Sequence, residues 1–254
     1  MRLLSERHGL AAAAAELAGK SAEEALSWSL SRFPADRVVL ASSFGPEDVV
    51  LIDMFHGLGR FPRVVTLDTG RLPQETHDLI AEMRAKYALK LETQFPDAER
   101  VSDLVDRHGP NLFHESVELR RLCCRVRKVE PLRRALDGAR AWITGLRREQ
   151  SPDRAAAGLI EWDDEFGLVK LNPLAEWTNE RVWRRIRERG LPYNRLHDAG
   201  YPSVGCGPCS RAVKPGDDPR SGRWWWENDL AAKECGLHRG ESRAMRMSRG
   251  EPAD

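Results

Sequence analysis

Apolar and polar positions along the chain alternate between short β-branched runs and longer segments with helical spacing. The strand candidates are RVVLASSF (37–44), RVVTLDTG (63–70), LKLETQF (89–95), ARAWITG (139–145) and GLVKLNPL (167–174). Helical patterns separate them, as in EDVVLIDMF (47–55) and the stretch from Pro73 to about Tyr87. Strands that alternate with helices predict an α/β fold with a parallel twisted sheet and helices on both faces.

Two further helices have clear start signals. Ser21 is followed three residues later by Glu24, which predicts a capping box for the helix in SAEEALSWSLSRF. Thr178 stands where an N-cap is expected before RVWRRIRERG (181–190). The clustered arginines of this last segment are typical of a solvated helix face.

Ligands of such sheets bind beyond the carboxyl ends of the strands, so three loops become candidate binding segments. SSFGPED combines hydroxyls and a glycine with a helix start, which suits an oxyanion. LDTGRL and GLRREQSPDR add hydroxyl, carboxylate and arginine groups. Each loop alone could simply turn the chain, but together they favour an anionic, nucleotide-like ligand. The candidate binding residues here are Ser42, Ser43, Phe44, Gly45, Asp68, Thr69, Gly70, Arg71 and Arg154. Neither G-x-G-x-x-G nor G-x-x-x-x-G-K-[ST] occurs, which removes the main support for dinucleotide and P-loop sites.

The cysteines form an unusual pattern. There are five, an adjacent pair in RLCCRVRK, a C-x-x-C in VGCGPCSR and one in KECGLHRG: Cys123, Cys124, Cys206, Cys209 and Cys235. Adjacent cysteines are hard to join to each other because a disulfide needs Cα atoms about 5–6 Å apart. Their partners must come from elsewhere, and the odd count leaves one cysteine over. A four-cysteine zinc site is one interpretation.

Composition and termini narrow the class of protein. The formal net charge is +1, which excludes a strongly basic nucleic-acid binder. The first twenty residues lack a secretory signal pattern, and no apolar run approaches the ~20 residues that span a bilayer. We expect a cytoplasmic protein with no membrane or nucleic-acid partner, whose cysteines serve metal binding or catalysis. The polar stretch at about 239–254 predicts a loose tail.

These segments resemble a known family, the assimilatory adenylyl-sulfate reductases. The matching motifs lie between about residues 37 and 238 and read, in order, SSFGPEDVVL, LDTGRLPQET, CCRVRKVEPL, TGLRREQS, NPLAEW, VGCGPCSRAV, RSGRWWWE and KECGLH. The resemblance implies an adenine nucleotide α-hydrolase-like fold. The phosphate loop of that group is usually S-G-G-x-D-S, and its replacement by SSFGPED suggests nucleotide binding without ATP cleavage.

The resemblance also implies a cofactor and a reaction. A [4Fe–4S] cluster would be bound by Cys123, Cys124, Cys206 and Cys209, and Cys235 would be the nucleophile. The reaction would reduce adenosine 5′-phosphosulfate (APS) to sulfite and AMP through an S-sulfocysteine, with thioredoxin as reductant, in sulfate assimilation and cysteine biosynthesis. Because a thiolate must approach an anion, cations are needed, and the candidates are Lys128, Arg154, Arg220 and Arg223. Residues 1–209 would form the nucleotide-binding domain with the iron–sulfur site and 210–254 a catalytic tail; a homo-oligomer is possible.

Three alternatives stay open at this point. The first is a reductase of the 3′-phosphorylated substrate (PAPS), or one that uses both substrates. The second is an iron–sulfur tRNA-thiolation enzyme, which would need ATP. The third is a zinc-stabilised nucleic-acid-binding module. Three consecutive tryptophans, Trp224, Trp225 and Trp226, cannot all face one way, so we expect at least one of them to dock the tail.

Overall fold

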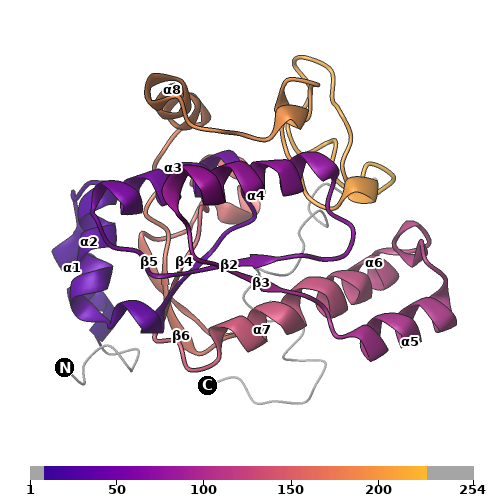
Figure 1. Cartoon of the computed structure of the whole chain (residues 1–254), viewed down its shortest axis with the longest axis horizontal. Helices are drawn as coiled ribbons and strands as arrows, with labels where there is room; N and C mark the ends of the chain where they lie inside the picture. The colour runs from indigo at the N-terminus through magenta and orange to yellow at the C-terminus, as the bar shows by residue number, and fades with distance from the viewer. Residues whose placement is uncertain (1–8, 228–254) are drawn as a thin grey trace.

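The computed structural model describes residues 9–227. These residues form a six-stranded sheet in the order β3-β2-β1-β4-β6-β5 (Figure 1). The strands are β1 (Val38–Ala41), β2 (Arg63–Leu67), β3 (Leu91–Gln94), β4 (Ala141–Ile143), β5 (Ile160–Asp163) and β6 (Leu168–Leu171). Adjacent strands run parallel except β5, which pairs antiparallel with β6.

Helices precede, follow and connect the strands. The α-helices are α1 (Leu10–Leu17), α2 (Ala22–Arg32), α3 (Pro46–Gly57), α4 (Gln74–Tyr87), α5 (Ala98–His108), α6 (Val117–Cys124), α7 (Glu130–Leu136) and α8 (Asn179–Arg189). Short 3₁₀ turns are η2 (Ala35–Arg37), η3 (Leu112–His114), η5 (Arg148–Gln150), η6 (Pro152–Arg154), η7 (Arg195–His197) and η8 (Gly207–Cys209). Between α6 and α7 lies η4 (Arg125–Val129), which is a π-helix.

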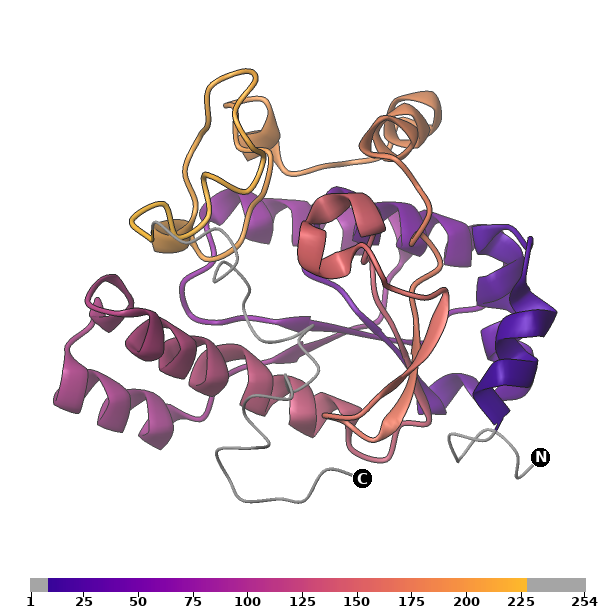
Figure 2. The ribbon, with the colours of Figure 1, turned by 180° about the vertical axis from the view of Figure 1, so that it is seen from behind.

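Alternate residues of each central strand enter two different cores, as the period of two along a strand requires. Val38 and Leu40 of β1 belong to the core under α2, α3 and α4, whereas Val39 packs with α7 on the opposite face. In β4, Trp142 likewise belongs to the α7 side while its neighbours face the other core. The two views agree that α3 and α4 cover one face and α7 the other (Figures 1 and 2). The predicted α/β fold with helices on both faces is therefore confirmed.

The predicted helix starts are also confirmed. Ser21 and Glu24 form the reciprocal capping box at α2, with the Glu24 N–H donating to Ser21 Oγ at 3.2 Å. Thr178 accepts from the Arg181 N–H at the start of α8.

The structure corrects the strand pattern in two places. The predicted runs are too long: 37–44 becomes Val38–Ala41, because the chain leaves the sheet at Ser42 to build a loop. The antiparallel edge strand β5 was not predicted, so the sheet is mixed rather than wholly parallel. Within the described residues, no helix combines the length and apolar character needed to cross a membrane.

Candidate functional site

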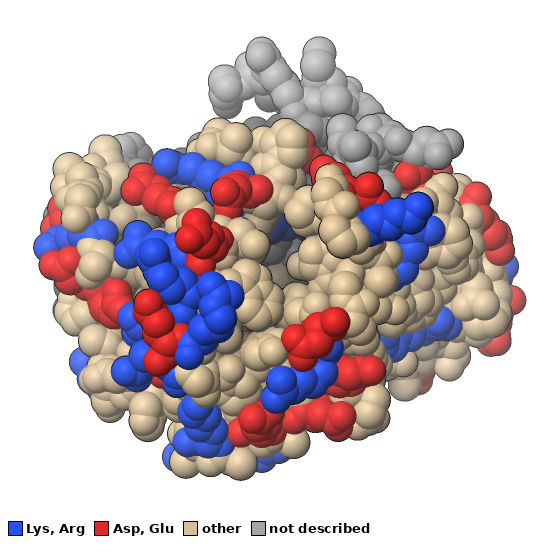
Figure 3. Space-filling model, turned by 90° about the horizontal axis from the view of Figure 1, so that it is seen from above, with Lys and Arg blue, Asp and Glu red and all other residues tan. Residues whose placement is uncertain are grey.

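A large cleft, about 1180 Å³, opens where the strand order reverses between β1 and β4. This is the position at which doubly wound sheets bind ligands. Its walls include most of the predicted binding residues: Ser42, Ser43, Phe44, Gly45, Thr69, Lys128, Arg154, Arg220 and Arg223. Seen from above, the molecule is hollowed at its centre, and Lys and Arg side chains gather on both sides of the hollow (Figure 3).

The loop after β1 is held in shape by a carboxylate from the first turn of α3. Asp48 Oδ2 accepts from the Ser43 N–H at 2.6 Å and from the Ser43 hydroxyl at 2.9 Å. Burial raises the pKa of Asp48 to about 7, and the charge of Glu47 adds to this, against the opposing bonds from Ser43 and Gly45. Gly145 leaves the necessary space, since a Cβ there would lie 2.6 Å from Asp48 Oδ1.

Backbone strain is concentrated around the site. In the described part of the chain, three non-glycine residues have positive φ: Phe44 at 57°, Ala88 at 47° and Trp224 at 41°. Ala88 ends α4, whereas Phe44 and Trp224 both line the cleft and are 1 % exposed. Such a conformation costs about 1–3 kcal/mol per residue and persists only where surrounding contacts fix it.

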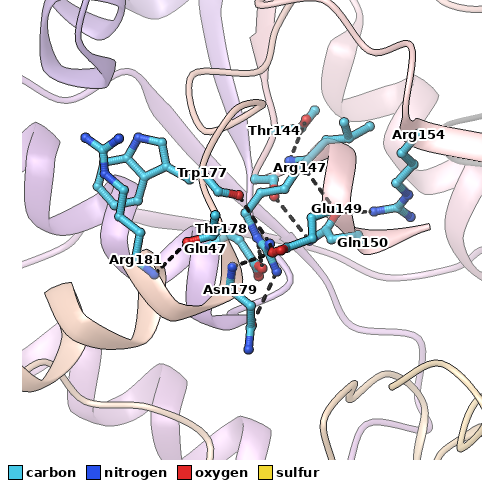
Figure 4. Close-up of polar contacts among 12 residues, drawn as sticks. Glu47, Thr144, Arg147, Glu149, Gln150, Arg154, Trp177, Thr178, Asn179 and Arg181 are labelled. Atoms are coloured by element: carbon cyan, nitrogen blue, oxygen red, sulfur yellow. Dashed lines mark hydrogen bonds and ion pairs between the residues drawn. The ribbon is translucent and has the colours of Figure 1, made fainter. Parts of the chain in front are cut away.

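Arg147 borders the cleft, but its guanidinium forms ion pairs with carboxylates of the protein itself. Its Nε donates to Glu47 at 2.8 Å, and its Nη1 donates to Glu149 at 3.0 Å and to the Trp177 carbonyl at 3.3 Å (Figure 4). Arg154, from the same loop, donates to Gln150 in this view. Arg147 therefore braces the loop after β4 against the start of α3.

Three predicted binding residues do not line the cleft: Asp68, Gly70 and Arg71. Asp68 caps its own turn by accepting from the Gly70 N–H at 2.8 Å. Arg71 lies over the ring of Phe113, 5.3 Å from its centroid, and donates to the Pro110 carbonyl. The Arg71 carbonyl accepts from the Gly207 N–H at 2.8 Å, so the segment joins the β2 loop to the C-x-x-C turn.

Four cysteine thiols surround a second, small cavity beside the cleft. Cys123 and Cys124 end α6, while Cys206 directly precedes η8 and Cys209 is its last residue. All four are 7–8 % exposed and line the cavity together with Arg71, Arg120, Arg127, Lys128, Phe113 and Trp224. In the part of the chain that the structure describes, no three His, Cys, Asp or Glu side chains are placed to hold a single metal ion. The thiols thus surround a space rather than converge on one point.

The π-helix η4 explains how Lys128 reaches this cavity. Lys128 follows Cys123 by five residues, which in an α-helix would turn it well away from that cysteine. A π-turn closes i→i+5 contacts instead and brings both residues to one side. Lys128 accordingly lines both the cavity and the cleft. Cys206 and Trp224 are likewise shared between the two spaces.

Cations and burial act in opposite directions on the thiols. Burial acts to raise the pKa of Cys206, but Lys128, the Thr69 hydroxyl, Arg223 and Arg127 outweigh it and the pKa is lowered. The Thr69 Oγ1 lies 3.2 Å from Cys206 Sγ. Burial raises the pKa of Cys123, and it raises that of Cys209 to about 11 with a contribution from Cys206. Among Cys123, Cys206 and Cys209, Cys206 is the thiol whose pKa is lowered, so it ionises more readily than the other two.

The two arginines of the DDPRSGRWWW segment lie differently. Arg223 is buried; its Nε donates to the Cys209 carbonyl at 3.1 Å, and a Cβ on Gly205 would lie 2.2 Å from its guanidinium. Arg220 lies on the cleft wall. The prediction about the tryptophans is confirmed in its first part, since Trp224 is buried, Trp225 is 43 % exposed and Trp226 packs on His114.

Several residues with defined positions at the site were missed by sequence reasoning. Arg120 and Glu227 form a buried ion pair, and Arg127 donates to the Thr69 carbonyl at 2.7 Å. Asp48 lies within SSFGPED but is not among the predicted binding residues. The cationic flank of the cysteine pair was the available signal for Arg127, whereas nothing local marks the pairing of Arg120 with Glu227. Cys235, the predicted nucleophile, lies outside the described residues.

Comparison with known proteins gives consistent results. The phosphoadenosine phosphosulfate reductase domain matches residues 37–212. An adenosine 5′-phosphosulfate reductase of Allochromatium vinosum is 51% identical over 219 residues, covering 86% of this chain and 84% of that protein. One from Burkholderia cepacia is 48% identical, covering 80% and 81%.

Solved structures agree on the fold. A phosphoadenylyl-sulfate (PAPS) reductase from Candida auris superposes with a TM-score of 0.70 at 28% identity, covering 82% of this chain and 98% of that one. Yeast FAD synthetase shares the fold alone, with a TM-score of 0.54 at 16% identity, covering 82% and 70%. With most of its length matched by the domain and by relatives about half identical to it, this chain belongs to the phosphoadenosine phosphosulfate reductase family.

Proposed function

We propose that this protein reduces APS to sulfite and AMP, with thioredoxin as reductant, in sulfate assimilation. The observation that carries the proposal is the wall shared by the two spaces of the site. Lys128, Cys206 and Trp224 line both the nucleotide-sized cleft and the four-cysteine cavity. The relatives from Allochromatium vinosum and Burkholderia cepacia, each about half identical to this chain, are named as reductases of APS, which favours this substrate over its 3′-phosphorylated form.

The cleft supplies binding and orientation. The adenine nucleotide would lie beyond the carboxyl ends of β1, β2 and β4, with its anionic part toward the loop of Ser42 and Ser43. Arg154, Arg220 and Lys128 supply positive charge along the wall. Arg147 is already engaged by Glu47 and Glu149, so its role is to hold the loop.

The four cysteines would hold a [4Fe–4S] cluster. Their donor set fits this group, since four thiols from two segments surround a cavity flanked by cations and do not converge on a single-ion position. When bound, the cluster would add a charged inorganic group beside Lys128. Neighbouring residues of this chain hold the cysteine segment in place: Thr69 contacts Cys206 Sγ, and Arg127 donates to the Thr69 carbonyl.

The chemistry proposed for Cys235 balances without a further reductant. Its thiolate attacks the sulfur of APS, the bond between that sulfur and the AMP phosphate oxygen breaks, and S-sulfocysteine remains. One thioredoxin thiolate attacks Cys235 Sγ, releases sulfite and forms a mixed disulfide. The second thioredoxin thiol resolves that disulfide and regenerates Cys235, so both electrons come from thioredoxin.

A substrate comparison tests the proposal. Anaerobically purified protein, assayed with thioredoxin, should release sulfite from APS with a kcat/KM at least about tenfold above that for PAPS, a difference of about 1.4 kcal/mol or more. Iron and acid-labile sulfide should be present in equal amounts. A preference for PAPS, or zinc in place of iron and sulfide, would contradict the assignment.

A further inference from the structure

The last described residues form a buried structure that the proposed reaction does not account for. Glu227 pairs with Arg120 through two contacts, Nε to Oε1 at 2.8 Å and a terminal nitrogen to Oε2 at 2.9 Å. The Arg120 side chain is 0% exposed and that of Glu227 is 5% exposed. Two-pronged arginine–carboxylate contacts of this kind fix direction as well as distance.

Two guanidinium groups lie against the ring of Trp224. The Arg120 guanidinium lies 4.4 Å from the centroid of the Trp224 ring, and that of Arg223 lies 4.9 Å from it. The Glu227 N–H donates to the Trp224 carbonyl at 2.9 Å, which closes a turn. This turn starts from a residue with a φ of 41°, so the surrounding contacts must hold a strained backbone in place.

The same group is joined to both cysteine segments. Arg120 stands three residues before Cys123 on α6. On the other side, the Trp224 N–H donates to the Cys209 carbonyl at 3.3 Å. Arg120 and Trp224 both line the cysteine cavity, and Trp224 also lines the cleft. The last described residues are therefore fixed relative to both spaces.

We propose that Arg120, Trp224 and Glu227 form a tail anchor, a positioning device that fixes where the segment bearing Cys235 departs from the site. Cys235 follows Glu227 by eight residues. A chain of that length reaches at most about 3.3–3.6 Å per residue, so a fixed Glu227 restricts where the Cys235 thiol can go. Without the anchor, the preceding backbone bridge is the one between Ser210 and Arg223, and Arg223 lies twelve residues before Cys235. A longer, undirected tether lowers the effective concentration of the thiol at the substrate.

The tail anchor makes Arg120 and Glu227 positioning residues, and this inference rests on the proposed role of Cys235. In Glu227→Gln the shape is kept but the ion pair is broken; in Arg120→Lys the charge is kept but the two-pronged contact is lost. Glu115→Gln is the matched control, since it removes one exposed carboxylate close to α6 without touching the anchor.

The test measures formation of the sulfonated Cys235 in a single turnover with APS and no thioredoxin, by quenched-flow sampling and intact-protein mass spectrometry. Iron content and the Kd for AMP are measured alongside. We expect both anchor variants to form the adduct at least fivefold more slowly than Glu115→Gln, with iron content and AMP affinity within twofold of wild type.

Adduct formation slowed by less than fivefold would overturn the inference. Loss of iron or of AMP affinity in both variants would also overturn it, because the pair would then serve folding rather than positioning. If only one variant loses iron or AMP affinity, the rate of adduct formation in the other variant tests the inference. Failure of the proposed function is distinguishable, since wild type itself would then form no adduct on Cys235.

Discussion

The cleft and the cysteine cavity lie against each other but treat charge in different ways. At the cleft, Arg147 forms ion pairs with Glu47 and Glu149, and Asp48 accepts a hydrogen bond from Ser43. These charged side chains therefore stabilise the conformation of the loops. At the cavity, Lys128 and Arg127 face thiols, and the Arg120 charge is matched by Glu227. In the first region charged side chains therefore hold the loops in shape beside the cations of the cleft wall, whereas in the second region cations lie beside buried thiols.

This difference implies that the two regions can be disrupted separately. The largest expected effect comes from Cys206→Ser, because neighbouring cations and the Thr69 hydroxyl lower the pKa of Cys206 and favour its thiolate. We expect loss of visible absorption and iron, with activity lowered by more than about 100-fold, on the order of 3 kcal/mol. AMP affinity should stay within threefold by calorimetry. A variant with a full cluster would show that Cys206 is not a ligand.

Lys128 should have the next largest effect, since it belongs to both regions. Two like charges at about 4 Å repel by ~4 kcal/mol at an effective dielectric of about 20, so a cation near the reacting groups is needed. Lys128→Ala should lower kcat/KM for APS more than about tenfold. Lys128→Arg retains the charge and should lose less than that. Wild-type kinetics in the alanine variant would remove Lys128 from the mechanism.

Two glycines provide a matched pair for the comparison. A Cβ at Gly205 would meet Arg223 at 2.2 Å, while one at Gly145 would meet Asp48 at 2.6 Å. Each alanine substitution should destabilise its own region by about 1–3 kcal/mol. Gly205→Ala should speed iron loss without changing AMP affinity, and Gly145→Ala should weaken AMP binding without changing iron retention. If either variant changes both properties, the regions are not separable.

A separate effect, on stability rather than activity, concerns Asp48 and pH. Its folded pKa of about 7 lies above the ordinary value of 3.8, so the folded state binds the proton more tightly than the unfolded state does. Stability from this group is present at low pH and is lost as pH rises toward 7. Between pH 5 and 7 the loss should be about 2–3 kcal/mol, and Asp48→Asn should lack it. Urea unfolding of both proteins at pH 5, 6, 7 and 8 measures this; parallel curves would contradict the assignment.

The layout of the fold was predictable because its signals are local. The capping box of Ser21 and Glu24, the N-cap at Thr178 and the β-branched runs each follow from a few neighbouring residues. The strand ends were not predictable to the residue, since the loop after β1 depends on the contact of Asp48 with Ser43 and on the burial of Phe44. The short edge strand β5 has no long apolar run to reveal it.

The site was predictable in its chemistry but less so in its geometry. Cysteine spacing and the family resemblance predicted two cysteine segments acting together, and the structure brings all four thiols to one cavity. The π-helix η4 (Arg125–Val129) has no recognised sequence signature, yet it places Lys128 on the side of the cysteine cavity. Arg223 was predicted as a substrate cation, and its bond to the Cys209 carbonyl shows a structural use. The contact of Arg120 with Glu227 spans 107 positions and depends on tertiary packing alone.

The central claim is that Cys235 is sulfonated by a nucleotide bound in the cleft. Its most direct test is intact-protein mass spectrometry of wild type incubated with APS in the absence of thioredoxin. We predict a gain of about 80 Da on Cys235, one AMP released per adduct, and discharge of the adduct as sulfite when thioredoxin is added. No adduct under these conditions, or an adduct on a different cysteine, would contradict the account.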